Sequence, residues 1–197
     1  MTWAIEFDGV NDSMSFASAI TLVGDFNISF DSKYDTTARI YIGNGSSTAT
    51  SFIACLTGGE IRFKIAGTDY SFVGFAVSAL DDITVDISRV GSTLTTDVNG
   101  EVKVLLGVST SDVTFTTIGG LSAFPIIGQT TFMKIGSANH YSATASSHAA
   151  GTPVLVDTIS GNDATGVNMP TDGSAWIDLG GGVTVTPNYY QILMAGN

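Results

Sequence analysis

The sequence predicts an all-β protein, built as an antiparallel two-sheet β-sandwich, and three observations lead to that prediction. Residues 79–106 have the pattern of three consecutive antiparallel strands joined by two tight turns. Glycine is frequent, at 23 of 197 residues, and only 13% of residues are charged, a composition that favours strands and turns over helices. No stretch of about twelve or more residues shows the periodicity of an amphipathic helix.

The segment 79–106 shows the strand pattern most clearly. Within 83–88, isoleucine and valine alternate with threonine, aspartate and serine, so one face is apolar and the other polar. The chain reverses at residues 90–92 and again at Asn-Gly 99–100, a pair typical of a type I′ turn because both central residues need positive φ. The alternation then resumes in 102–106. Sheets with one apolar face stack in pairs to hide it, which predicts the sandwich.

The other strands are predicted from shorter runs of the same kind. Glycine, asparagine, aspartate and serine bound most of these runs and favour turns. The loop 43–50 and the stretch 139–151 lack alternation and are predicted to be irregular. Outside the segment 79–106, strands are predicted at 3–7, from 14–16 onward, and at 26–30, 39–42, 52–56, 61–65, 70–75, 113–118, 131–135, 154–156, 176–179 and 183–185, with 189–194 docking as a strand or short helix.

Charge and length limit the classes of partner. The formal net charge is −11, from 7 basic and 18 acidic residues, and such a field repels phosphate backbones, so no nucleic-acid partner is expected. No apolar run approaches the roughly 18 residues of a membrane-spanning helix, and no signal peptide is recognised at the start, so we expect no membrane insertion. Without a linker or a break in composition, residues 1–197 are predicted to form a single domain.

Four segments, taken in order, carry a resemblance to a known family. They are FDGVND at 7–12, the strand 83–89 with its Asn-Gly hairpin, Ile-Gly-Gly at 118–120, and DTISGNDATG at 157–166. Together they resemble the laminin G-like, concanavalin A-like jelly rolls of the lectin–glucanase group, which occur in phage and bacterial surface proteins. In many relatives the last of these segments precedes the first, whereas here it follows. The resemblance implies a two-sheet jelly roll with a concave face, sugar or protein binding in many members and hydrolysis in some.

The acidic residues do not match the catalytic pattern of the glycanase branch. That branch places acids at E-x-D-x-E spacing, which brings a nucleophile and an acid to one face of a strand. Asp82 and Asp86 share a face here, but Thr84 occupies the position between them. We therefore predict that the protein is not an enzyme, and the two aspartates are expected on a solvated strand face.

Two clusters of aspartate and asparagine are candidate calcium ligands. Calcium prefers oxygen atoms from carboxylates, amides and backbone carbonyls. The alternative is that these residues favour turns because they bond to their own backbone. No cofactor is expected to be required, and calcium is the candidate ion, with ligands from Asp8, Asn11 and Asp12 in one turn and from Asp157, Asn162 and Asp163 in the other.

Aromatic rings are candidate sugar platforms, because a ring face stacks on the apolar face of a sugar. Trp3 and Tyr70 occupy alternating strand positions and are expected in the core. Tyr34, Tyr41 and Tyr141 are nearer predicted loops and are the candidate ligand-binding residues.

These observations lead to two functional hypotheses. The first is a non-enzymatic structural or adhesion protein of a virion, such as a phage decoration or fibre-associated protein. It would assemble in the host cytoplasm and bind capsid proteins, tail proteins or surface glycans, and an oligomer is expected. The alternative is a carbohydrate-binding lectin domain of a bacterial surface protein, located at the cell surface.

Overall fold

Strands make up the regular structure of the described chain. The computed structural model describes residues 3–8, 10–34, 39–45, 49–119, 127–130, 132–143 and 152–179, in which no helix could cross a membrane. The strands are β1 (Trp3–Asp8), β2 (Ser13–Leu22), β3 (Phe26–Lys33), β4 (Arg39–Gly43), β5 (Phe52–Leu56), β6 (Glu60–Ile65), β7 (Thr68–Phe72), β8 (Asp82–Val90), β9 (Thr93–Val98), β10 (Glu101–Leu106), β11 (Val113–Ile118), β12 (Ile127–Thr130), β13 (Phe132–Ile135), β14 (Asn139–Ser142), β15 (Val154–Asp157), β16 (Ala164–Val167) and β17 (Trp176–Asp178).

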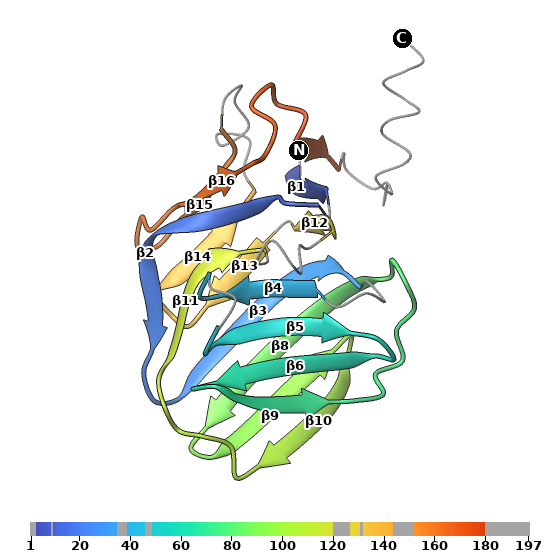
Figure 1. Ribbon diagram of the computed structural model, residues 1–197, viewed down its shortest axis with the longest axis vertical. Coiled ribbons are helices and arrows are strands. Elements are labelled where there is room, and N and C mark those ends of the chain that lie inside the picture. The colour runs from blue at the N-terminus through green and yellow to red at the C-terminus, as the bar shows by residue number, and fades with distance from the viewer. Residues whose placement is uncertain are drawn as a thin grey trace.

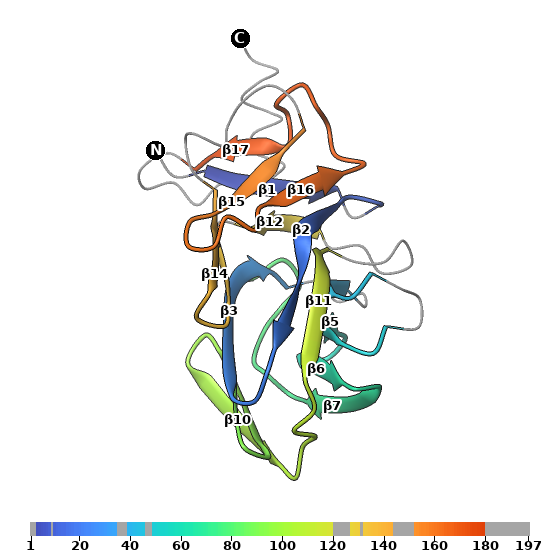
Figure 2. The same cartoon turned by 90° about the vertical axis from the view of Figure 1, so that its left-hand side faces the viewer.

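Two antiparallel layers face each other. The strands pair in the continuous order β10-β9-β8-β3-β13-β14-β15-β16-β2-β11-β4-β5-β6-β7, and the sheet folds back on itself at β15. One layer therefore runs from β10 to β14 and the other from β16 to β7, as Figure 1 and Figure 2 show. This arrangement is the antiparallel two-sheet β-sandwich that the sequence predicts.

The core fills the space between the layers. Phe26 of β3 lies edge-on to Phe63 of β6, with ring centres 5.8 Å apart. Phe30 of β3 packs against Tyr41 of β4 with ring centres 5.2 Å apart. These strands belong to opposite layers, so the aromatic rings join the two apolar faces, and burial of such area supplies much of the stability of the fold.

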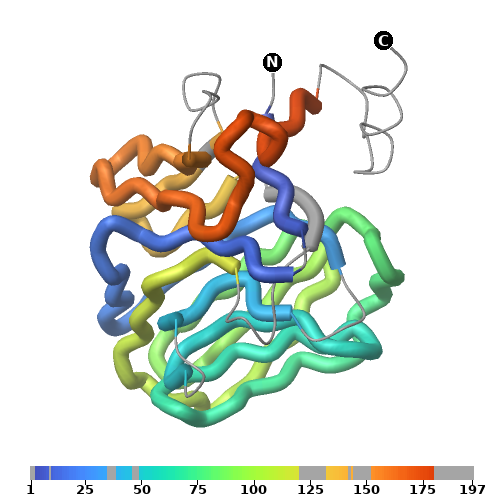
Figure 3. The backbone as a smooth tube through the Cα atoms, turned by 45° about the horizontal axis from the view of Figure 1, so that its top comes forward, coloured from blue at the N-terminus to red at the C-terminus, as the bar shows by residue number. Residues whose placement is uncertain are grey.

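A smaller sheet lies at one end of the sandwich. Its order is β12-β1-β17, with β1 antiparallel to both neighbours. Trp3 is opposite Asp178, so the beginning of the described chain lies beside its end, as Figure 3 shows. Strands distant in sequence thus close this end of the molecule.

Most strand predictions are confirmed, and one is corrected. The Asn-Gly turn has φ values of 53° at Asn99 and 89° at Gly100, as a type I′ turn requires. The stretch 139–151 was predicted to be irregular, yet its first residues form β14 between β13 and β15. Those neighbours impose the strand where apolar alternation is too short to reveal it. Segments 183–185 and 189–194 lie outside the described residues.

Candidate functional site

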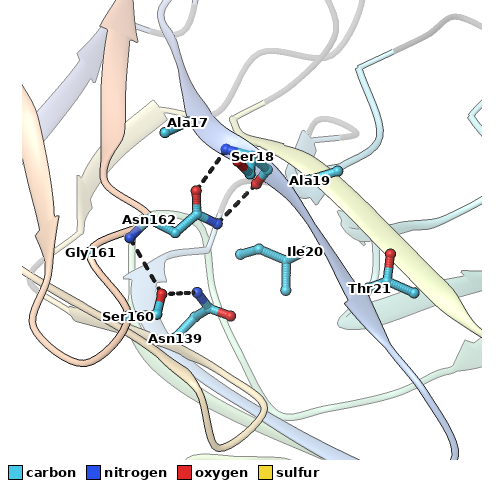
Figure 4. A pocket seen from close by; sticks show the side chains of 9 residues that line it. All are labelled: Ala17, Ser18, Ala19, Ile20, Thr21, Asn139, Ser160, Gly161 and Asn162. Atoms are coloured by element: carbon cyan, nitrogen blue, oxygen red, sulfur yellow. Dashed lines mark hydrogen bonds between the residues drawn. The ribbon is translucent and has the colours of Figure 1, made fainter.

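A groove opens where the sheet folds from one layer into the other. It lies between β2 and the turn that follows β15, and its volume is about 380 Å³. Figure 4 shows the lining side chains, which come from Ala17, Ser18, Ala19, Ile20, Thr21, Asn139, Ser160, Gly161 and Asn162.

An irregularity in β2 creates this groove. The strand pairs with β16 up to Phe16 on one side, and on its other side it pairs with β11 at Met14 and Ser15 and again from Ile20. The register with β11 shifts between Ser15 and Ile20. Along a regular strand Ser18 would point inward between two buried residues, but residues 17–19 are all exposed. A β-bulge of this kind bends a strand and leaves extra residues outside the ladder. The bulge turns the small side chains of 17–19 toward the groove.

Asn162 occupies the place of the missing strand partner. Its Oδ1 accepts a hydrogen bond from the Ser18 backbone N–H at 2.7 Å, and its Nδ2 donates to the Ser18 carbonyl at 2.9 Å. Both backbone groups of Ser18 are thereby satisfied where the ladder is interrupted. The carbonyl of Asn162 accepts a hydrogen bond from the Tyr141 hydroxyl at 2.7 Å, which fixes the turn against the core.

The carboxylate of Asp157 organises the turn that carries Asn162. Its Oδ1 accepts hydrogen bonds from the backbone N–H groups of His140 at 2.9 Å, Ile159 at 3.1 Å and Ser160 at 3.3 Å. Its Oδ2 accepts from Asn139 Nδ2 at 2.8 Å and from the Ser160 hydroxyl. The buried charge is thus surrounded by donors, and the turn is fixed in one conformation.

These contacts shift two pKa values in opposite directions. Burial alone would raise the pKa of Asp157, but hydrogen bonds from His140, Ser160, Ile159 and Asn139 outweigh it and hold that pKa far below its usual range. Burial, together with the nearby charges of Asp157 and Asp163, raises the pKa of Tyr141 well above its usual value. Asp157 therefore stays ionised and the tyrosine stays a hydrogen-bond donor at physiological pH.

The groove presents neutral polar groups to solvent. Its polar side chains are hydroxyls and carboxamides, and none of the lining residues is charged. The hydroxyl of Ser18 forms no hydrogen bond within the described part of the chain, so it is available to a ligand. Such a surface matches an uncharged ligand that both donates and accepts hydrogen bonds.

The three candidate tyrosines are core residues, which corrects the prediction that they form a sugar platform. Tyr34, Tyr41 and Tyr141 are 1%, 2% and 0% exposed. Each hydroxyl reaches a backbone carbonyl: Tyr34 donates to Leu56 at 2.5 Å, and Tyr41 donates to Lys33 at 2.9 Å. Because the polar tip is satisfied internally, the whole ring can be buried and offers no face to a sugar.

The first predicted calcium turn is held by its own carboxylates. Asp8 Oδ1 accepts hydrogen bonds from the backbone N–H groups of Val10 at 2.7 Å and Asn11 at 3.2 Å. Asp12 Oδ2 accepts from the Asp8 N–H at 3.0 Å, whereas Asp12 Oδ1 is buried and has no hydrogen-bond partner among the described residues. Burial raises the pKa of Asp12, and the charge of Asp8 adds to the rise against the hydrogen bond from the Asp8 N–H.

The second predicted calcium turn is occupied by internal hydrogen bonds. Asp157 and Asn162 have the partners given above, and Asp163 Oδ1 accepts from the Asp157 N–H at 2.9 Å. In the described ranges, no group of three or more His, Cys, Asp or Glu side chains is arranged to hold a metal ion. Calcium therefore stays a prediction, and the geometry favours the first turn over the second.

The two aspartates of β8 lie on the solvent side, as predicted. Asp82 is ion-paired with Lys33, and Asp86 accepts a hydrogen bond from the Ser29 hydroxyl. Both residues are exposed on the outer face of the sheet, and neither is among the residues that line the groove.

Of the polar residues that line the groove, the sequence pattern identifies Asn162 alone as a candidate site residue. Asn162 is a candidate calcium ligand in the sequence analysis, and in the structure its carboxamide holds the bulge. Ser18, Thr21, Asn139 and Ser160 were not singled out. The available signal was the Ala-Ser-Ala run at 17–19, where alternation along β2 stops.

Solved structures support the fold. No protein-family model matches the sequence, and no curated protein is significantly similar to it. The heptameric SAP-like pentraxin from Limulus polyphemus superposes with a TM-score of 0.56 at 10% identity, over 68% of this chain and 75% of that one. Looser likenesses are the LG1–3 region of the laminin α2 chain (TM-score 0.47, 14% identity, 71% of this chain, 26% of that one) and a congerin II double mutant (0.41, 10%, 64% and 99%). The chain thus has a concanavalin A-like jelly-roll fold.

Proposed function

We propose that this protein is a non-catalytic binding module that recognises neutral glycans through the groove between β2 and the turn after β15. The observation that carries the proposal is the lining itself, in which hydroxyl and carboxamide groups surround an opening without charged side chains. Neutral sugars present hydroxyl groups, which both donate and accept hydrogen bonds, and carry no charge.

The position and rigidity of the groove support the same function. Ser18 and Asn162 are fixed relative to each other by two hydrogen bonds, so little conformational freedom is lost when a ligand binds. Among the residues that the structure describes, no aromatic ring lines the opening, so the affinity depends on hydrogen bonds rather than stacking. Weak, saturable binding of single neutral glycans is the expected behaviour.

A groove-filling variant tests the proposal. Ala19→Trp places a bulky ring at an exposed lining position without removing any hydrogen bond that holds the turn. Ala79→Trp, at an exposed alanine between β7 and β8, is the matched control. Glycan-array screening followed by calorimetry should show binding by the wild type and Ala79→Trp, and loss of binding by Ala19→Trp. A wild type that binds no neutral glycan, or an Ala19→Trp variant with unchanged affinity, would overturn the proposal.

Attachment to a virion is a second candidate role and rests on the sequence prediction. A glycan-binding module on a particle or on a cell surface would serve adhesion in either setting. Co-sedimentation with capsid or tail proteins distinguishes the two settings, because only the virion role requires binding to a particle protein.

A further inference from the structure

The strand β10 ends one side of the sandwich with an unusually apolar outer face. It is the terminal strand of the sheet order, and its residues alternate between half-buried and exposed. The exposed set consists of Val102 at 57%, Val104 at 53% and Leu106 at 80% exposure. Leu106 pairs with Thr93 of β9, and Thr93 pairs in turn with Val90 of β8. Val90 is 67% exposed, so the apolar surface continues from β10 onto the sheet.

The free edge of β10 also carries unpaired backbone groups. Within the described residues, β9 is the strand that pairs with β10, and their register is regular from Glu101 to Leu106. In a hairpin with a two-residue Asn-Gly turn, the two residues that flank the turn, here Val98 and Glu101, exchange backbone hydrogen bonds with each other. The alternation of an antiparallel ladder then directs the N–H and C=O groups of residues 102, 104 and 106 away from β9.

The opposite end of the sheet order is protected, in contrast to β10. Its terminal strand, β7, exposes Thr68 and Asp69, and the carboxylate of Asp69 lies 3.5 Å from Lys64 Nζ and 3.8 Å from an Arg62 nitrogen. Charged residues on an edge strand hinder pairing with another chain. The charges of β10, at Glu101 and Lys103, are paired with each other on its inner side, and its outer face has no charge, no proline and no bulge.

We propose that two copies of this chain pair through β10, edge to edge and antiparallel across a twofold axis. With Val104 opposite Val104 of the second copy, Val102 of each copy lies opposite Leu106 of the other. Residues 102, 104 and 106 are the ones whose backbone groups are free, so this register satisfies all of them. It also joins the two apolar stripes into one.

The charges on β10 favour this register. Glu101 and Lys103 form an ion pair of 2.7 Å on the inner side of the strand, so the local charge is neutral despite the net charge of −11. Both side chains also bind the segment after β7, since Glu101 accepts from the Ala76 N–H at 3.0 Å and Lys103 donates to the Gly74 carbonyl at 3.2 Å. A shift of one copy by two residues in one direction would place Lys103 opposite Lys103 of the other copy. A shift in the other direction would leave part of the free edge unpaired. Like charges directly opposite across strands are destabilising, which selects the symmetric register centred on Val104.

The oligomeric state of three proteins tests this interface. Sedimentation equilibrium of the wild type should give the mass of two chains, and Val104→Lys should give the mass of one because two lysines would meet on the axis. Val23→Lys, at a 71% exposed valine between β2 and β3, is the matched control and should stay dimeric. Circular dichroism melting checks that each variant folds. Since Val104 is half-exposed, Val104→Lys is expected to fold.

A charge-reversal mixture makes the test specific. Val104→Glu alone should also be monomeric, and an equal mixture of Val104→Lys and Val104→Glu should recover the mass of two chains. A monomeric wild type would overturn the proposal and leave the edge to a different protein. A dimer that survives Val104→Lys, or variants that do not recover on mixing, would place the interface elsewhere and overturn it equally. Glycan binding is measured separately, so failure here leaves the proposed function intact.

Discussion

Asn162 and Ser18 form a reciprocal pair of hydrogen bonds across 144 residues of sequence, with the asparagine carboxamide bound to both backbone groups of the serine. The asparagine side chain supplies the hydrogen bonds that a neighbouring strand supplies elsewhere in the sheet. This single pair ties the turn after β15 to the bulge in β2 and thereby sets the shape of the groove.

Replacing Asn162 by alanine should loosen the groove without unfolding the protein. The variant loses two hydrogen bonds, and the backbone of Ser18 is left to water. Urea titration should therefore give a free energy of unfolding that is lower by about 1–2 kcal/mol. Amide hydrogen exchange should rise at residues 17–19 while the core strands stay protected. Asn27→Ala, at an exposed asparagine of β3, is the control and should change neither quantity. Unchanged exchange at the bulge would contradict the role given to Asn162.

Asp157 should make the protein sensitive to acid. Its folded pKa lies below its unfolded value, near 3.8, so its contribution is complete above that value and is lost as the pH falls toward the folded pKa. Asp157→Asn should lower the free energy of unfolding at neutral pH by about 2–4 kcal/mol, since an amide nitrogen then faces hydrogen-bond donors. Urea titrations between neutral and acid pH should show a shrinking gap between variant and wild type. A constant gap would contradict the assignment.

Glu6 should act with the opposite sign. Its folded pKa is raised above 4.5, first by burial and then by the charge of Asp12, so the ionised form opposes folding. Glu6→Gln should therefore raise the melting temperature at neutral pH. The difference from wild type should fade as the pH falls below the unfolded pKa, where both proteins are neutral at this position. A variant that melts below the wild type at neutral pH would contradict this explanation.

The alternation of apolar residues was sufficient to predict the strands but not the site. Ile83, Val85 and Ile87 point inward as the pattern predicts, because burial of apolar side chains is a local property of each strand. The tyrosines could not be assigned to the core in this way. Tyr141 is buried because its hydroxyl finds the carbonyl of Asn162, 21 residues away, and sequence spacing does not encode that contact.

The groove depends even more on long-range pairing. The register of β2 against β11 shifts between Ser15 and Ile20, and the pairing of β2 with β16 ends at Phe16, so the bulge depends on strands that are distant in sequence. The sequence predicts the two acidic turns. It does not distinguish a turn that binds an ion from a turn whose side chains bond to their own backbone, because the same residues fit both. The hydrogen bonds of Asp157 identify its turn as self-bonded, and only the folded structure reveals them.

Calcium should act through the turn at Asp8–Asp12. In the described part of the chain the buried Oδ1 of Asp12 has no hydrogen-bond partner, and Glu6 adds a second charge nearby, so a cation would stabilise both carboxylates. Calcium should raise the melting temperature of the wild type and of Asp163→Asn, and EDTA should reverse the shift. Asp12→Asn should remove it, because a ligand that binds only the folded state stabilises that state. Equal melting in calcium and EDTA would exclude calcium as a ligand of this turn.

The buried guanidinium of Arg89 should be the most costly charged group to remove. It is 1% exposed and continues the inward-facing side of β8, where an apolar residue is expected. Its nitrogens donate to the carbonyls of Gly24 at 3.1 Å, Ser109 at 3.2 Å and Ser111 at 2.6 Å, and its carbon Cζ lies 4.6 Å from the centre of the Phe26 ring. The side chain thus links the loop before β3 to the loop before β11.

Arg89→Met keeps most of the volume but leaves those carbonyls without a donor, so it should lower the free energy of unfolding by about 3 kcal/mol or more. Arg89→Lys should cost less, because one ammonium reaches some of the carbonyls. Arg62→Met is the control: Arg62 is partly exposed and ion-paired with Glu60 at 2.8 Å, and such a pair is worth about 1 kcal/mol or less. Urea titration of the three variants gives the order, and a loss at Arg89 no larger than that at Arg62 would show that the two loops are held together by other contacts.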